Sequence, residues 1–212
     1  MLEVQLQGLY ISTLFNLNNE LIPILQKSLE LGRSFIVKEY QKRPTPLFLL
    51  WKALLFSVLN SDAQFLLGPV SISGEFSEIA KSLTIKFIKK NYFLEEMAQY
   101  VEAKTEYQPQ VSDDFDEEAF YREVGNDFSK LDQYIGKYEP GYHTPILVRQ
   151  YICLLGTQVI GFNIDPLFNN CLDALIFMDL SKAPQKTIEN LVKDYPNPLA
   201  IYEKLKNFEY RA

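Results

Sequence analysis

The sequence predicts a single α/β domain in which a mixed β-sheet is covered by helices. Segments rich in β-branched and aromatic residues alternate with segments whose apolar residues recur at helical spacing. The chain of 212 residues is 47% hydrophobic and 14% aromatic, enough for one substantial core over residues 1–212. No internal repeat is visible. The order of strands and helices along the chain matches neither a helix bundle nor a β-sandwich, and it therefore indicates the mixed sheet.

The first half of the chain predicts two strands and two helices. In chain order they are a strand at residues 9–15, a short helix at 17–29, a strand at 29–37 and a largely buried helix at 47–59. A basic, proline-flanked loop precedes the second helix. There Thr45 is the expected cap and Pro46 the expected first-turn residue.

The second half predicts three strands and three helices around an acidic insertion at residues 111–128. In chain order they are a strand at 65–73 interrupted by Gly-Pro, a helix at 76–90, a helix at 144–154, strands at 157–164 and 174–180, and a helix at 184–193. Each of these segments follows turn-forming residues, which sets its boundary.

The net charge of −6 comes from one part of the chain. Between Val111 and Tyr142 there are nine acidic and three basic residues, which leaves eighteen of each elsewhere. A run of like charges is usually hydrated, so we interpret this segment as a solvated excursion or an acid-rich helix. Nothing in the charge pattern favours nucleic-acid binding.

Several other classes of protein are disfavoured. Cys153 and Cys171 have neither a CxxC spacing nor a nearby histidine, so we predict buried reduced thiols and no metal site. His143, the single histidine, lies in a turn-like segment. The apolar run at 47–59 is shorter than the roughly 20 residues of a membrane-spanning helix, and the N-terminus lacks a signal-peptide pattern. We therefore expect a cytoplasmic protein, with peripheral contact to the inner membrane face as an extension.

The basic loop before the buried helix is the first candidate site. Lys42 and Arg43 precede a helix N-terminus, where backbone N–H groups converge, and this combination holds phosphate or pyrophosphate groups. A basic surface loop that merely precedes a helix gives the same pattern.

Two blocks of sequence carry a resemblance to a known family. The first runs from Leu29 to Ser34 (LELGRS), with Tyr40, LLWK at 49–52 and LGPVS at 67–71, and the second from Ile160 to Asp165 (IGFNID), with Phe168-Asn169 and Asp173. They resemble the N-acyltransferases that form ornithine lipid and the related hemolysin family, over nearly the whole chain. The second block is the looser match.

The resemblance implies a GNAT fold, with a mixed, mostly antiparallel sheet flanked by helices and lacking its first strands. Relatives have a further stretch before this segment, so an N-terminally truncated chain is expected, either a fragment or one that covers an exposed edge with another copy. It also implies that the strands at 29–37 and 67–73 splay apart to admit the pantetheine arm of an acyl donor, with Gly68 and Pro69 beside the thioester.

The implied activity is transfer of a fatty or 3-hydroxyacyl group from acyl carrier protein, or from coenzyme A, to the amine of an amino acid such as ornithine or glycine. No tightly bound cofactor is implied. The acyl-donor site would comprise Ser34, Phe35, Lys42, Arg43, Gly68, Pro69 and Ser71. The basic residues, with Lys86 to Lys90, would contact the acidic carrier protein.

Glu30 and Arg33 are the expected catalytic pair, with Glu30 as base or as the group that orients the amine, and Arg33 as its ion-pair partner or as a ligand of the acceptor carboxylate. A purely structural pair is the alternative. Asp165, Asn169 and Asp173 would bind the acceptor ammonium, and turn geometry is the alternative for them. The rival function is a non-catalytic module that binds an acyl carrier or a lipid.

Overall fold

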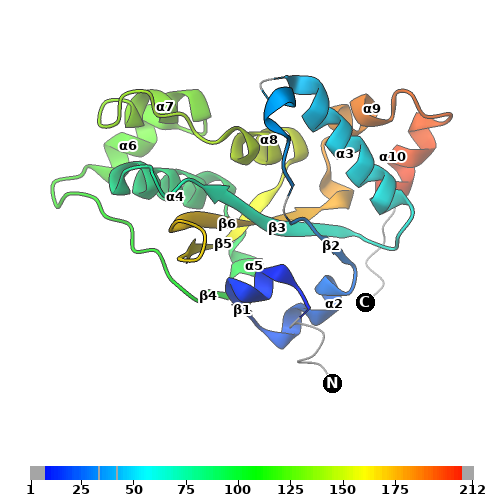
Figure 1. Cartoon of the computed structure of the whole chain (residues 1–212), viewed down its shortest axis with the longest axis horizontal. Coiled ribbons are helices and arrows are strands. Elements are labelled where there is room, and N and C mark those ends of the chain that lie inside the picture. The colour runs from blue at the N-terminus through cyan, green and yellow to red at the C-terminus, as the bar shows by residue number, and fades with distance from the viewer. Residues whose placement is uncertain (1–7, 33, 42, 207–212) are drawn as a thin grey trace.

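The computed structural model describes residues 8–32, 34–41 and 43–206. A central sheet has most of the helices on one face and the N-terminal segments on the other (Figure 1). The strands are β1 (Phe15–Leu17), β2 (Ser28–Glu30), β3 (Phe65–Ile72), β4 (Val101–Ala103), β5 (Gln158–Asp165) and β6 (Cys171–Asp179). The 3₁₀-helices are η1 (Tyr10–Thr13), η2 (Asn19–Leu21), η3 (Lys38–Tyr40) and η4 (Leu180–Lys182).

The α-helices are short apart from α3 and α4. They are α2 (Ile22–Leu25), α3 (Pro44–Leu59), α4 (Glu78–Tyr92), α5 (Glu95–Ala98), α6 (Glu117–Val124), α7 (Phe128–Ile135), α8 (Ile146–Leu155), α9 (Gln185–Val192) and α10 (Pro198–Lys206). Among the described residues, no helix is both long and apolar enough to cross a bilayer.

The main sheet is mixed and mostly antiparallel, which confirms the predicted fold class. Its strand order is β2-β3-β6-β5, with β2 parallel to β3 and the other pairs antiparallel. Strands β1 and β4 form a separate antiparallel pair. The parallel β2–α3–β3 unit needs a helical crossover, and α3 supplies it.

Each face of the sheet has its own core, because successive strand residues point to opposite faces. Alternate residues such as Leu66, Val70 and Ile72 of β3 join the larger core beneath the helices. Phe65 and Leu67 join the smaller core, which is completed by η1 and β1. The sheet thus buries apolar residues on both sides.

Strand β2 leaves the sheet after only three paired residues. Its last contact is the Leu31 N–H, which donates to the Leu67 carbonyl oxygen over 2.7 Å. At this crossing a Cβ on Gly68 would lie 2.0 Å from the Leu31 oxygen, so only glycine fits. Beyond Leu31 the edge of β3 is open, and Pro69, which has no N–H to pair, lies on this stretch.

Several predicted boundaries were wrong. The strand expected at 29–37 ends at Glu30, and the one expected at 9–15 is η1 followed by β1. Helix α3 begins at Pro44 with Arg43 as its N-cap, so Thr45 and Pro46 lie inside the first turn. The Gly-Pro pair does not interrupt β3, because the neighbouring strand has already departed.

Candidate functional site

A pocket of about 730 Å³ opens where β2 departs from β3. Its walls come from η1, the chain after β2, β3, α8 and the β5–β6 loop. Val70 and Ile176 line it from the helix-covered face, whereas Ser71 and Asp173 line it from the opposite face. The pocket therefore reaches both sides of the sheet at its open edge.

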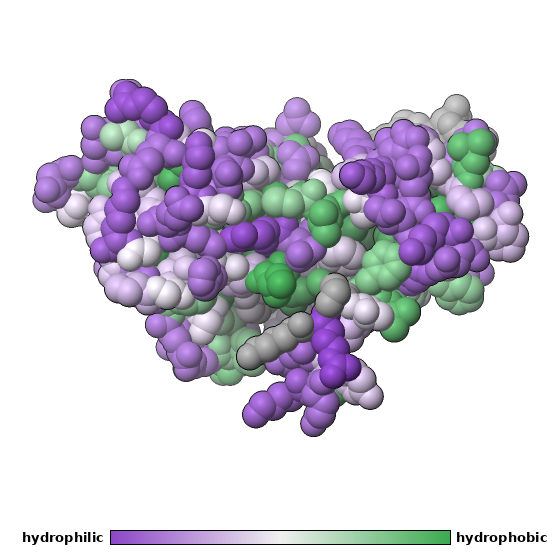
Figure 2. All heavy atoms as spheres, turned by 90° about the horizontal axis from the view of Figure 1, so that it is seen from above, coloured by the Kyte–Doolittle hydropathy of each residue, from purple (hydrophilic) through white to green (hydrophobic). Residues whose placement is uncertain are grey.

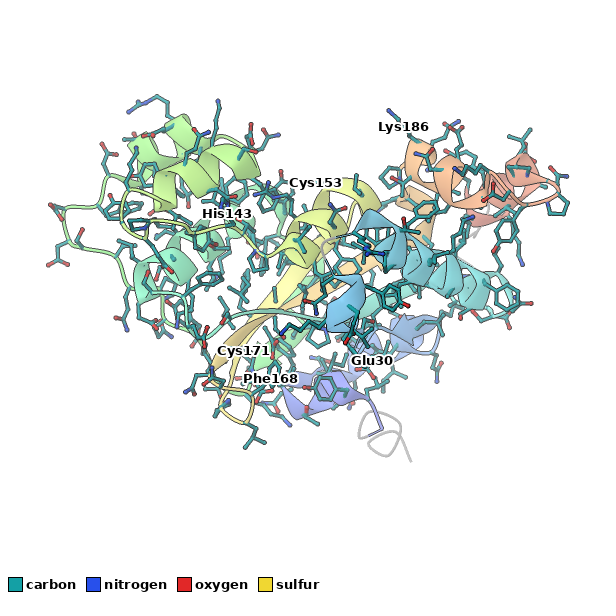
Figure 3. The ribbon with its side chains drawn as sticks, turned by 45° about the horizontal axis from the view of Figure 1, so that its top comes forward. Glu30, His143, Cys153, Phe168, Cys171 and Lys186 are labelled. Atoms are coloured by element: carbon teal, nitrogen blue, oxygen red, sulfur yellow. The ribbon has the colours of Figure 1, made fainter. Side chains whose placement is uncertain are left out.

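Two buried carboxylates share one wall of this pocket. Asp165 is 7% exposed and Asp173 is 2% exposed. Asp165 is paired with Cys171 across β5 and β6, and Asp173 lies two residues further along β6, so all three point to the same face. In Figure 3, Cys171 marks this end of β6, close to Phe168 of the β5–β6 loop.

Asp173 has the electrostatic environment of an acid–base group. The Ser71 hydroxyl donates to its Oδ1 over 2.6 Å, and the Cys171 thiol lies 3.6 Å from the same oxygen. Burial raises the pKa of Asp173, the hydrogen bond from Ser71 lowers it, and the nearby charge of Asp165 raises it again. The pKa is raised on balance, as expected for a carboxylic acid in a desolvated site near another carboxylate.

The Cys171 thiol is not a nucleophile in this environment. Burial, with the charge of Asp173 beside it, raises the pKa of the thiol to about 12. It therefore stays protonated at neutral pH. Both cysteines are free, but Cys153 on α8 is exposed, which corrects the prediction that both are buried.

A second, apolar pocket of about 820 Å³ lies between α3 and α8. Leu47, Phe48 and Trp51 line it from α3, and Ile146 and Leu154 line it from α8. Its lining shares Ser34, Phe35 and Leu147 with the first pocket. A ligand can thus extend from the carboxylates into an apolar groove, which we call the α3–α8 groove.

The predicted donor residues that are described gather around these pockets. Ser34 and Phe35 line both, Pro69 and Ser71 line the first, and Arg43 lines the α3–α8 groove. Gly68 packs against Leu31 at the crossing instead. Lys42 lies outside the described residues.

Glu30 has a structural environment. Its Oε2 accepts the Tyr10 N–H over 2.9 Å and its Oε1 accepts the Ile11 N–H over 2.7 Å, which anchors η1 to β2. Its side chain is not part of either pocket lining. Arg33 lies outside the described residues, so the proposed ion pair stays a prediction.

Of the three acceptor residues, Asp165 and Asp173 line the pocket and Asn169 does not. Asn169 and Asn170 have φ values of 53° and 49°, the left-handed conformation that asparagine tolerates in tight turns. Asn169 therefore shapes the β5–β6 turn, as the turn-geometry alternative predicted.

Two lysines of α4 have acidic partners within the chain. Lys86 pairs with Glu117 of α6 in the acidic segment over 3.1 Å, and Lys81 pairs with Glu78 of its own helix. Asp116 and Asp127 of the acidic segment cap α6 and α7. The carrier contact predicted for Lys86 to Lys90 would have to compete with Glu117 at Lys86.

Sequence reasoning missed the contribution of α8. Leu147 and Tyr151 line the carboxylate pocket, and burial raises the pKa of the Tyr151 phenol. The amphipathic pattern of α8 predicts a buried face. It contains no signal that this face meets the open edge of β3.

The chain matches the family model described as an acetyltransferase (GNAT) domain over residues 1–51 of its 212. The matched part contains β2, the chain that leaves the sheet and the first turns of α3. No curated protein and no solved structure matches the chain. The match and the mixed sheet are together consistent with a GNAT-like fold, and they support a general acyltransferase activity.

Proposed function

We propose that this protein is an N-acyltransferase that moves a fatty or 3-hydroxyacyl group from a thioester to the amine of an amino acid such as ornithine or glycine, in aminolipid synthesis. One observation carries the proposal. The pocket at the open edge of β3 joins two buried carboxylates to an apolar groove, which suits an amine at one end and an acyl chain at the other.

The α3–α8 groove is proposed to hold the acyl chain of the donor. Ile146 and Leu154 are eight residues apart on α8, and a rise of 1.5 Å per residue gives an apolar wall about 12 Å long. This wall is much longer than an acetyl group. The thioester would then lie between Phe35 and Pro69, where the two pockets meet.

The carboxylate wall is proposed to receive the acceptor amine. An ammonium group would neutralise Asp165 and Asp173, whose burial makes uncompensated charge costly. Asp173, with its raised pKa, then takes the proton as the amine becomes nucleophilic.

The chemical step forms a C–N bond and breaks the C–S bond of the thioester. The neutral amine, formed when Asp173 takes a proton from the ammonium, attacks the carbonyl carbon. The C–S bond then breaks, and a second proton from the nitrogen passes to the sulfur, which leaves as a thiol, while Asp173 releases its proton to solvent. Backbone N–H groups of Ser34 and Phe35 are the proposed donors to the oxyanion, because this segment lines both pockets and lies outside any strand.

The donor's carrier is proposed to be acyl carrier protein, with coenzyme A as the alternative. Arg43 lines the groove, and Lys42 precedes it in the sequence. An acidic carrier or a pyrophosphate would each be attracted to these cations. Initial rates with the two donors at matched acyl chain decide between them.

The deciding experiment incubates the protein with 3-hydroxyacyl carrier protein and a pool of amino acids, and detects N-acylated product by mass spectrometry. We expect Asp173→Asn to lower kcat by about a hundredfold or more, as loss of a general base does. Glu30→Gln leaves one side-chain oxygen for the two N–H groups of η1 that Glu30 accepts. We therefore expect this variant to lose stability and to keep most of its kcat.

Two outcomes would redirect the assignment. A large loss of kcat in folded Glu30→Gln, with Asp173→Asn fully active, would return the role of base to Glu30. Carrier binding by the folded wild-type protein, with no product from any amine, would favour the non-catalytic lipid-binding module.

A further inference from the structure

Exposed apolar side chains surround the openings of the two pockets. Five large hydrophobic residues both line a pocket and are mostly or partly exposed, and we call them the apolar rim. They are Phe35, Ile146, Leu154, Leu167 and Phe168. Leu167 is 97% exposed and Phe35 is 79% exposed. Hydration of such apolar side chains is unfavourable, and packing within this chain does not offset it.

The rim comes from three separate elements. Leu167 and Phe168 lie in the β5–β6 loop, Ile146 and Leu154 on α8, and Phe35 in the chain between β2 and α3. On the face above α8 and the start of α3, hydrophobic side chains lie between lobes that are mostly hydrophilic (Figure 2). Five of the eleven exposed large hydrophobic residues among those described thus surround the route into the pockets.

Two exposed cations belong to the same stretch of chain as Phe35. Arg43 lines the α3–α8 groove, and Lys38 follows Phe35 by three residues; neither makes an ion pair with any described residue. In a protein of net charge −6, this is a local site of attraction for an anionic surface.

We propose that the apolar rim, with Lys38 and Arg43, docks on an anionic lipid surface. A fluid lipid interface accepts single protruding side chains without a shaped socket, and its negative headgroups attract nearby lysine and arginine residues. Docking would place the opening of the α3–α8 groove against the apolar phase. The proposal goes beyond the proposed function, because binding to lipid needs no acyl transfer.

The test measures cosedimentation of the full chain with vesicles of phosphatidylcholine containing 30% phosphatidylglycerol, and with vesicles of phosphatidylcholine alone. We expect binding to the anionic vesicles. The double variant Leu167→Ser, Phe168→Ser should weaken it by about tenfold or more, because two apolar side chains that would leave water at the lipid surface are replaced by polar ones. Lys38→Glu should weaken it by about fivefold or more and should make the remaining binding less sensitive to salt, because fewer cations contact the anionic surface.

Matched controls lie away from the rim. Leu199→Ser removes a comparably exposed leucine on α10, and Lys186→Glu reverses an exposed lysine on α9, far from Phe168 in Figure 3. Both should bind the anionic vesicles like the wild type. Asp173→Asn should also bind them, which separates docking from catalysis.

Three results would overturn the proposal. The first is that the wild type does not bind anionic vesicles. The second is that the rim and control variants bind them equally well. The third is rim-dependent binding to an acidic carrier protein without binding to vesicles. The last result would assign the same surface to a protein partner. Because the side chains substituted in the rim, Lys38 and control variants are exposed, thermal unfolding of these variants should match the wild type.

Discussion

At the scale of single residues, Asp173 is the pocket carboxyl group whose pKa the fold raises. Its pKa is raised by burial and by the charge of Asp165, and is lowered by the hydrogen bond from Ser71. These influences have opposite signs, so they can be separated. The proposed base must be deprotonated, and the rate should fall as pH falls through its pKa.

We therefore expect two substitutions to move the acid limb of the pH–rate profile in opposite directions. Asp165→Asn removes a neighbouring negative charge and should lower the pKa of Asp173. Ser71→Ala removes a donor to the carboxylate and should raise it. Profiles of kcat between pH 4 and 8 for the two variants check this, and shifts in the same direction would contradict the assignment.

The same shift has a consequence for stability. A carboxyl group whose folded pKa is raised binds its proton more tightly in the folded state, so its contribution is favourable at low pH and is lost as pH rises through that pKa. Asp173→Asn should thus raise the free energy of unfolding at pH 7 relative to wild type, and much less at pH 4. Urea unfolding at both pH values measures the difference.

At the scale of elements, one carboxylate fixes α8 relative to α7. Asp132 of α7 accepts the Thr144 N–H over 2.9 Å and the Thr144 hydroxyl over 2.6 Å, and the Arg149 guanidinium lies 2.5 Å from its other oxygen. Its side chain is 11% exposed. The start of α8, and with it one wall of the α3–α8 groove, depends on this carboxylate.

Asp132→Ala should lower the free energy of unfolding by about 3 kcal/mol, because the buried Thr144 loses the acceptor of both its N–H and its hydroxyl, and Arg149 loses its ion pair. Glu123→Ala is the matched control. It breaks the exposed pair with Lys137, at 52% and 53% side-chain exposure, and should cost less than about 1 kcal/mol. Urea denaturation of the two variants measures both values, and equal losses would contradict the role given to Asp132.

Local patterns predicted most elements but not the departure of β2. The strand predicted at 65–73 and the helix predicted at 76–90 rest on residues close in sequence, and they formed as β3 at 65–72 and α4 at 78–92. The strand predicted at 29–37 stopped at Glu30, because its continuation depends on the close approach of Leu31 to Gly68. That approach joins residues far apart in sequence, and propensity carries no signal for it.

The candidate site shows the same division. Asp165 and Asp173 were recognised from sequence, and the hairpin register places them on one wall. Glu30 was recognised too, but its hydrogen bonds to Tyr10 and Ile11 depend on how the N-terminal segment folds back. The contribution of Tyr151 needed the packing of α8 against β3, which no local motif encodes.

At the scale of the whole molecule, the acidic segment offsets positive charge on α4. Glu117 accepts a hydrogen bond from the Tyr121 hydroxyl over 2.6 Å and pairs with Lys86 over 3.1 Å. These contacts, the one with Tyr121 first, lower the pKa of Glu117. Part of the excess negative charge between Val111 and Tyr142 is thus paired with positive charge within the fold.

Glu117→Gln keeps an acceptor for Tyr121 and removes only the charge. A carboxylate with a lowered folded pKa stabilises above its unfolded value of about 4.5 and loses that contribution as pH falls through the folded pKa. The variant should therefore lose up to about 1 kcal/mol at pH 7, since the Glu117 side chain is 48% exposed and solvent screens its charge, and almost nothing at pH 3. Salt at 1 M should shrink the loss at pH 7.

Glu118→Gln, an exposed neighbour with no ion pair among the described residues, serves as control in the same urea titrations. An equal loss at both pH values would show that side-chain packing, and not charge, connects α6 to α4.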